Sequence, residues 1–148
     1  VRQRALAARY RPRVVCIEWL EPLMVAGNWV PEIVASAGGR YEAVVAGRHS
    51  ETWDAERLVA AAPEVVLVAP CGFGLGQTRS ELEALTAQPV RRGLAAVRNG
   101  RVYAIDGNAY LNRPGPRIIE SLELVAGLVQ PGLLAGRMPA DGWFRIEG

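Results

Sequence analysis

The residues that could do chemistry in this 148-residue chain gather in a few short stretches. The richest is residues 106–117, DGNAYLNRPGPR, which lies between two apolar runs. Its asparagine amides and arginine guanidinium groups are hydrogen-bonding groups suited to holding a ligand. The Pro-Gly-Pro that follows is typical of a turn that ends a loop. The stretch is therefore either a plain turn or part of a binding site.

A nucleophilic mechanism would use Cys71 as the attacking thiol and His49 as the general base. Cys71 lies in a glycine-flanked loop, and His49 is the only histidine. No sequence pattern joins them, and local signatures of such pairs do not transfer between families. A small residue at a turn explains Cys71 more simply, so we expect no enzyme active site.

Phosphate and metal sites also find little support. Residues 72–77, GFGLGQ, resemble a phosphate-binding loop, but the G-x-G-x-x-G spacing is missing and the chain contains no lysine. The possible metal ligands do not lie at ligand spacing, and the two cysteines form no CxxC motif. These possible ligands are Glu18, His49, Cys71 and Asp106. We therefore expect neither a catalytic cofactor nor a metal.

Composition excludes some classes of partner. Seventeen basic and fifteen acidic side chains give a net charge of +2, and the arginines are scattered, which does not favour nucleic acid. No apolar run approaches the roughly 20 residues that span a bilayer. Half of the residues are hydrophobic, which is enough for the core of one domain or one lobe of a larger protein.

The elements that must position these residues alternate between strand and helix. Continuous apolar runs predict buried strands at 13–20, 64–69 and 101–106, and 41–46 could form a short strand. Helices are expected at 28–39 with Asn28 as the cap, at 54–62 with Asp54 or Thr52 as the cap, at 77–87 and at 116–129. Loops are expected at 21–27 and 47–52, and residues 131–148 show no clear pattern. This order predicts an α/β fold with a mostly parallel sheet.

In such a sheet, ligands bind outside the carboxyl ends of the strands. Three loops that carry large or polar groups follow the three main strands. We expect them to form one binding edge from Glu18, Trp19, Cys71, Gly72, Phe73, Asn108, Tyr110, Asn112 and Arg113, with Trp29 as a further candidate. Aromatic faces with amide and guanidinium donors suit a large planar or amphipathic ligand. As alternatives, each aromatic could belong to the core, and Arg113 could be an internal brace to an acidic residue.

The first residues read as the last turns of a helix. Leu6 and Tyr10 lie four apart on one face, and Pro12 ends the pattern. Because the pattern begins in the middle of a helix, we expect the chain to be a fragment.

Three segments together resemble a known family. Residues 11–39, 60–74 and 96–124 are similar to the C-terminal lobe of the cobalamin- and iron-siderophore-binding proteins of ABC importers, and the cobalamin type is most alike. The resemblance covers residues 11–131. It implies two Rossmann-like three-layer lobes joined by one long helix, with the ligand in the cleft between them and no reaction catalysed. Residues 1–11 would end the inter-lobe helix, residues 12–131 would form the C-terminal lobe, and residues 132–148 would be a tail.

The resemblance assigns roles to single residues. Arg113 falls on the pocket arginine that would contact amide groups on the corrin edge. The family has an aromatic pair before that arginine, and here one member is Leu111 beside Tyr110. The side chain of the first pocket loop falls at Glu18 or Trp19.

Two further assignments lie in the next segment. The aromatic residue that stacks on cobalamin should lie at 48–53, where Trp53 is available. Glu56 falls on the outer-surface glutamate that docks an arginine pocket of the permease. As an alternative, Glu56 is a solvated carboxylate that favours the start of a helix.

The resemblance therefore implies a binding component that delivers cobalamin or a related corrinoid to ABC permease subunits. Ferric siderophores and haem are alternative ligands, and an enzyme or cofactor-binding domain is an alternative reading of the fold. The missing N-terminal lobe would supply the other wall of the cleft. The expected location is periplasmic, or extracytoplasmic and anchored to the membrane.

Overall fold

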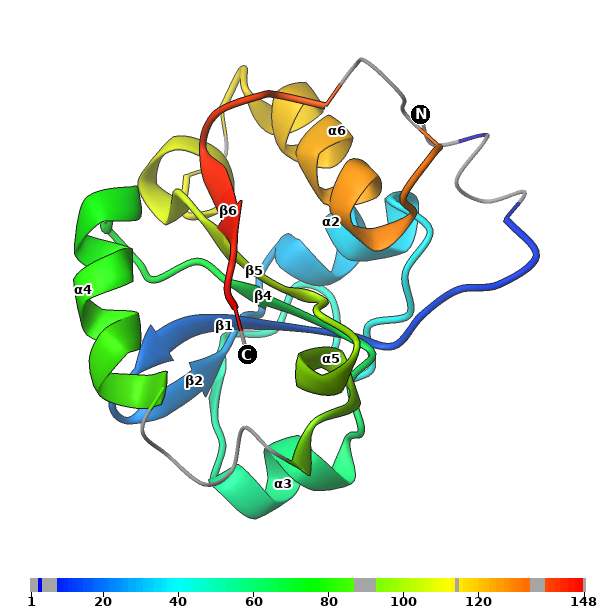
Figure 1. The fold of residues 1–148 in the computed structure, drawn as a ribbon. Coiled ribbons are helices and arrows are strands. Elements are labelled where there is room, and N and C mark those ends of the chain that lie inside the picture. The colour runs from blue at the N-terminus through cyan, green and yellow to red at the C-terminus, as the bar shows by residue number, and fades with distance from the viewer. Residues whose placement is uncertain (1–2, 4–7, 87–92, 114, 134–137, 148) are drawn as a thin grey trace.

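A single six-stranded sheet with the order β3-β2-β1-β4-β5-β6 organises the computed structural model (Figure 1). The structure describes residues 3, 8–86, 93–113, 115–133 and 138–147. The strands are β1 (Val14–Leu20), β2 (Leu23–Val25), β3 (Glu51–Thr52), β4 (Val65–Val68), β5 (Val102–Ile105) and β6 (Trp143–Arg145). The central strands β1, β4 and β5 are parallel, whereas β2 and β6 pair antiparallel with their neighbours. The predicted α/β fold with a mostly parallel central sheet is confirmed.

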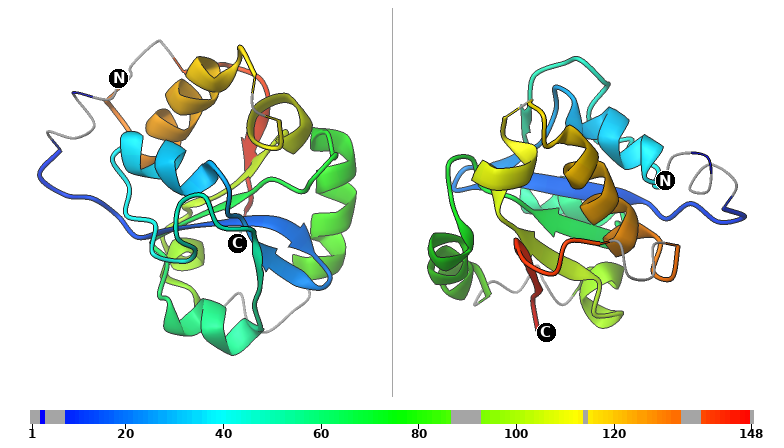
Figure 2. Two further views of the ribbon diagram at one scale, coloured as in Figure 1. Left: turned by 180° about the vertical axis from the view of Figure 1, so that it is seen from behind. Right: turned by 90° about the horizontal axis from the view of Figure 1, so that it is seen from above.

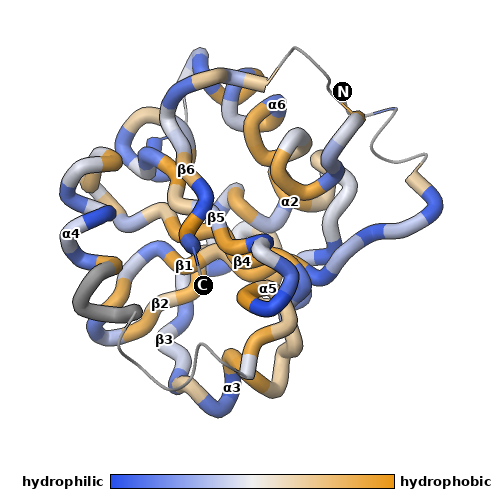
Figure 3. The backbone as a smooth tube through the Cα atoms, in the orientation of Figure 1, coloured by the Kyte–Doolittle hydropathy of each residue, from blue (hydrophilic) through white to orange (hydrophobic). Residues whose placement is uncertain are grey.

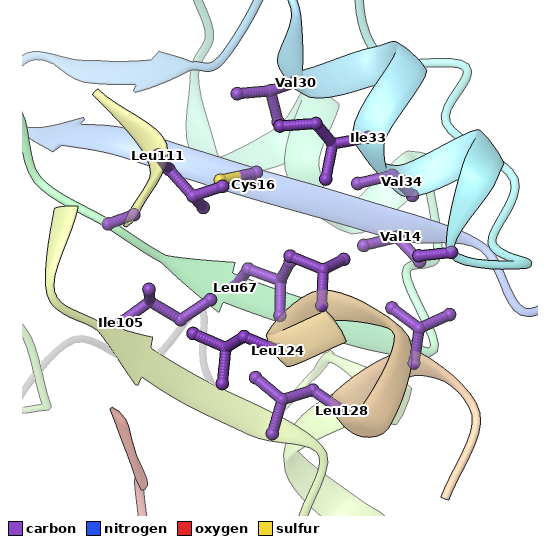
Figure 4. Packing of buried hydrophobic residues seen from close by; sticks show 14 of the residues in the cluster. Val14, Cys16, Val30, Ile33, Val34, Leu67, Ile105, Leu111, Leu124 and Leu128 are labelled. Carbon is purple, nitrogen blue, oxygen red and sulfur yellow. The ribbon is translucent and has the colours of Figure 1, made fainter. Parts of the chain in front are cut away.

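Helices cover both faces of the sheet (Figure 2). On one face, α2 (Val30–Ser36) and α6 (Ile118–Val129) pack on alternate strand residues such as Cys16, Leu67 and Ile105 (Figure 4). On the other face, the intervening strand residues pack on α3 (Ala55–Ala60), α4 (Leu75–Thr86) and α5 (Ala95–Arg98). The central strands β4 and β5 are apolar at every position because both faces are covered, as Figure 3 shows for β4. The chain is thus the three-layer lobe that the sequence predicts.

The antiparallel part of the sheet differs from the prediction. Residues 21–27, expected as a loop, contain β2, and residues 47–52, also expected as a loop, contain β3. Residues 41–46 form no strand. Their neighbours Gly47 and Arg48 bond to the backbone of Asn28, which has a left-handed φ of 55°. This segment is therefore held against the start of α2 instead of the sheet.

The helix boundaries are largely as predicted. Asp54 caps α3 by accepting a hydrogen bond of 2.7 Å from the Arg57 amide. The prediction of Asn28 as the cap of α2 is wrong. The helix begins after Trp29, and Pro31 lies in its first turn. The short helix α5 was not predicted.

The two ends of the chain also differ from expectation. Residues 143–145 form β6, and the rings of Trp143 and Tyr103 pack edge to face at 6.0 Å, so the tail completes the sheet instead of only covering it. Residues 8–11 are not helical, and most of the remaining expected helix lies outside the described residues. Tyr10 instead donates a hydrogen bond to Glu64.

Candidate functional site

The loops at the carboxyl ends of β1, β4 and β5 are joined to one another by hydrogen bonds. The Cys71 amide donates to the Glu18 carbonyl at 2.9 Å, and the Asn108 amide donates to the Phe73 carbonyl at 3.3 Å. The Asn112 side-chain amide donates to the Pro70 carbonyl at 2.9 Å. The predicted convergence of these loops is therefore present, and we call residues 18–19, 70–74 and 106–113 the carboxyl edge.

An aromatic pair crosses from the first loop to the second. The rings of Trp19 and Phe73 pack edge to face, with their centroids 5.4 Å apart at 60°. Both residues are half-buried, and the Trp19 indole donates to the Glu21 carbonyl at 2.9 Å. The pair offers rigid apolar area with its polar atom already paired, which suits contact with a flat ligand.

The carboxyl edge also carries polar groups. Asn108 and Arg113 are exposed, as are Cys71 and Gly72, and Glu18 is half-buried. No described acidic residue forms an ion pair with Arg113, so the predicted alternative of a brace to Glu18 or Asp106 is not realised. An exposed guanidinium on a structured turn can donate to acceptors on a ligand.

The third loop is a tight turn rather than an open loop. Residues Gly107–Leu111 (η2) form a π-helical turn that begins at Asp106, whose carboxylate accepts from the Ala109 amide at 2.8 Å. A Cβ atom at position 107 would lie 2.5 Å from the Pro70 carbonyl oxygen. Glycine therefore lets this turn lie directly against the loop after β4.

Two predicted contact residues of this turn serve the fold instead. Tyr110 is 7% exposed and packs over Gly142 in the core, so it does not offer a face to a ligand. Burial and, to a lesser extent, the charge of Asp141 raise the pKa of Tyr110. The Asn112 amide is directed to Pro70, so Asn112 joins two loops.

The remaining tryptophans have other surroundings than expected. Trp29 is half-buried and donates its indole N–H to the Leu111 carbonyl at 2.8 Å. Trp53, the candidate for stacking on a ligand, is 7% exposed, belongs to the core on the α3 side, and carries the Arg57 guanidinium 4.3 Å from its ring centroid. It also lines a cavity of about 200 Å³ with Val15 and Ala61. Because only 7% of Trp53 is exposed, its ring faces the core and this cavity and does not lie open at the carboxyl edge.

Other candidate chemistry gains no support from the described residues. His49 is exposed in the loop before β3, and no hydrogen bond between described residues joins it to Cys71. No group of three or more metal-ligating side chains occurs in the described part of the chain. None of the described helices is long and apolar enough to cross a membrane. Glu56 is exposed in the first turn of α3, as predicted.

Sequence reasoning missed two residues that shape the third loop. Trp29 was considered only as a contact face, and Ser121 was not considered. Ser121 is fully buried on an apolar face of α6 and donates to the Tyr110 carbonyl at 2.5 Å. A serine among the leucines and valines of a helix is a signal that a buried polar partner is needed.

A three-layer lobe with a polar and aromatic carboxyl edge has the architecture in which α/β proteins bind small molecules. Residues 2–109 match the family model described as periplasmic binding protein, and the chain belongs to this family.

Solved structures share the fold. An ABC transporter substrate-binding protein from Listeria monocytogenes is 20% identical with a TM-score of 0.73 over 84% of this chain and 50% of its own. A periplasmic heme binding protein from Pseudomonas aeruginosa is 24% identical with a TM-score of 0.69 over 86% and 46%. The periplasmic vitamin B12 binding protein BtuF of Vibrio cholerae is 20% identical with a TM-score of 0.66 over 87% and 48%. The chain thus spans about half the length of each of these proteins, and no curated protein sequence matches it.

Proposed function

We propose that this chain is one lobe of the substrate-binding component of an ABC importer, and that its carboxyl edge is one wall of the ligand cleft. The observation that carries the proposal is the meeting of three strand-end loops in one structured edge, which carries the Trp19–Phe73 pair and an exposed Arg113 that forms no ion pair with a described residue. Apolar area with a few fixed donors is the composition of a site that binds and releases. A site without an activated nucleophile or a metal cluster in the described residues suits transport rather than catalysis.

The proposed ligand is cobalamin or a related corrinoid. Such a ligand is a broad ring with amide groups at its rim, which match the aromatic pair and the Asn108 and Arg113 donors. Haem and ferric siderophores are the alternatives, and proteins of similar fold are named for heme as well as for vitamin B12.

The chain covers about half the length of the solved proteins that share its fold, and this suggests what else the proposed protein contains. The natural gene product would add a second lobe, which supplies the opposite wall, and would act outside the cytoplasm. Glu56, exposed at the start of α3, is the proposed contact to the permease. Because the proposed contact of Glu56 is to the permease, Glu56→Gln should affect uptake in cells much more than ligand affinity in solution. As the alternative, a carboxylate at that position only favours the helix dipole.

Titration of the natural full-length protein tests the proposal. Cyanocobalamin, haemin and ferrichrome are added separately while tryptophan fluorescence is followed. The proposal predicts saturable quenching by one of them, largest for cyanocobalamin, and a smaller signal in Trp19→Phe because that ring lies in the cleft wall. No saturable quenching by any of the three ligands would reject the proposed function.

A further inference from the structure

The π-helical turn of the carboxyl edge ends in carbonyl groups that its own backbone does not satisfy. The last carbonyls of any helical turn have no partner within the turn and need donors from elsewhere. Here two side chains supply them. The Ser121 hydroxyl donates to the Tyr110 carbonyl at 2.5 Å, and the Trp29 indole donates to the Leu111 carbonyl at 2.8 Å.

These two donors come from separate segments of the chain. Ser121 lies in α6, and Trp29 directly precedes α2 as its N-cap residue. The Leu111 side chain points into the same core cluster as Cys16 and Val30 (Figure 4). The end of the turn is thus fixed by a buried side chain below it and by an indole N–H beside it.

Arg113 leaves the turn two residues after the carbonyl that Trp29 holds. Its own side chain is exposed and makes no ion pair with a described residue, so no described ion pair fixes the position of its guanidinium. The direction in which Arg113 departs is set by the backbone at Leu111 and Asn112. Ordering that backbone before a ligand arrives removes an entropic cost from binding.

We propose that Trp29 is a positioning residue, whose indole N–H holds the end of the 107–111 turn so that Arg113 is preorganised toward the ligand. This inference rests on the proposed function for its ligand, but not for the brace itself. Trp29 does not need to touch the ligand to act in this way. Replacing its N–H should therefore loosen the turn first and weaken binding as a consequence.

The chain offers a matched pair of variants. Trp29→Phe keeps an aromatic ring and removes the bond to Leu111. Trp143→Phe removes the same kind of bond, from an indole to the Pro139 carbonyl at 3.0 Å, also in a half-buried tryptophan. The bond of Trp143 lies within the tail, so its loss should reduce stability without releasing the end of the turn.

Hydrogen exchange in the ligand-free, natural full-length protein measures the brace directly. The amides of Tyr110 and Asn112 donate to the carbonyls of Asp106 and Gly107, so they report opening of the turn. Loss of one net hydrogen bond should speed their exchange roughly fivefold to tenfold in Trp29→Phe. Unchanged exchange at these amides, or equal acceleration in Trp143→Phe, would overturn the proposal.

Affinity for the ligand found by titration measures the consequence. Trp29→Phe should bind about fivefold or more weakly than Trp143→Phe at a similar loss of thermal stability, whereas a purely structural role would lower both melting temperatures and neither affinity. Faster exchange with unchanged affinity would reject the positioning role. If the unaltered protein binds none of cyanocobalamin, haemin and ferrichrome, the proposed function fails, and the exchange experiment still decides whether the brace exists.

Discussion

At the scale of single residues, the two cysteines show how position decides chemistry. Cys16 is 1% exposed in the core, where burial and then the nearby charge of Glu18 raise the pKa of its thiol. Cys71 is exposed at the carboxyl edge. Because the thiolate is the reactive form and a reagent must reach it, burial protects Cys16, whereas Cys71 is open to solvent.

Iodoacetamide at pH 8 should therefore label Cys71 alone in the folded protein. Mass spectrometry of tryptic peptides gives the extent at each site. Both cysteines should be labelled in guanidinium chloride, which serves as the control for reactivity. Labelling of Cys16 at the rate of Cys71 in the folded protein would show that the core described for β1 is wrong.

A second residue carries backbone strain. Ala62, in the connection between α3 and β4, has a left-handed φ of 45°, whereas its neighbour Ala61 has a φ of −65°. A residue with a Cβ atom is disfavoured in the left-handed region, and glycine is not.

Ala62→Gly should therefore raise the free energy of unfolding by about 0.5–1 kcal/mol. Ala61→Gly is the matched control and should lower it by a similar amount, because glycine at a helical φ only adds freedom to the unfolded chain. Urea denaturation measures both variants. Destabilisation of the protein by Ala62→Gly would contradict the strained conformation.

At the scale of elements, Glu64 anchors the segment that leads into β1. Its carboxylate accepts from the Arg13 amide at 3.0 Å and from Tyr10. Burial acts to raise the pKa of Glu64, but these hydrogen bonds and the Arg13 charge outweigh it, so the pKa lies below its ordinary value of 4.5. The anchor therefore stabilises the folded state when Glu64 is ionised.

This direction fixes the dependence on pH. A carboxyl group whose pKa is lowered by folding adds stability above its unfolded pKa and loses it as the pH falls through the folded pKa. Wild-type protein should be more stable than Glu64→Gln at about pH 7, and the difference should shrink from about pH 5 downward. Urea denaturation across this range measures it, and a difference that stays constant or grows in acid would rule out the anchor.

The elements that the sequence predicted correctly are those whose signals are local and strong. The continuous apolar runs of β1, β4 and β5 predict their strands, and Asp54 at the start of α3 predicts its cap. The short strands β2, β3 and β6 were missed because their pairing partners are distant or lie across an unexpected reversal of the chain.

For the candidate site, too, one part was predicted correctly from the sequence and another part was not. The topology of a parallel sheet is enough to bring the strand-end loops together, and this was predicted. The direction of each side chain was not. Tyr110 and Trp53 are in the core. Trp29 and Asn112 donate side-chain N–H groups to backbone carbonyls. Which aromatic faces a ligand depends on packing between distant segments, which no local pattern encodes.

At the scale of the whole molecule, the carboxyl edge of this lobe forms only one of the two walls that the proposed ligand cleft needs. A cleft that buries most of a large ligand needs walls on both sides, and one wall alone gives only part of the contact area. The chain spans about half the length of the solved proteins that share its fold.

The isolated chain should therefore bind the ligand at least about 100-fold more weakly than the natural full-length protein, since much of the buried contact is lost. Isothermal titration of both proteins tests this. Equal affinity of the two proteins would refute the two-lobed arrangement.

The most direct test of the account is the affinity of Arg113→Ala in the natural full-length protein. Arg117→Ala is the matched control, because Arg117 is also exposed and close in sequence but lies 3.7 Å from Glu120 in an ion pair at the start of α6. Loss of a charged donor to the ligand should weaken binding about tenfold or more, with an unchanged melting temperature. Arg117→Ala should bind like the unaltered protein. Equal affinity of Arg113→Ala and the unaltered protein would contradict the claim that the carboxyl edge is a wall of the ligand cleft.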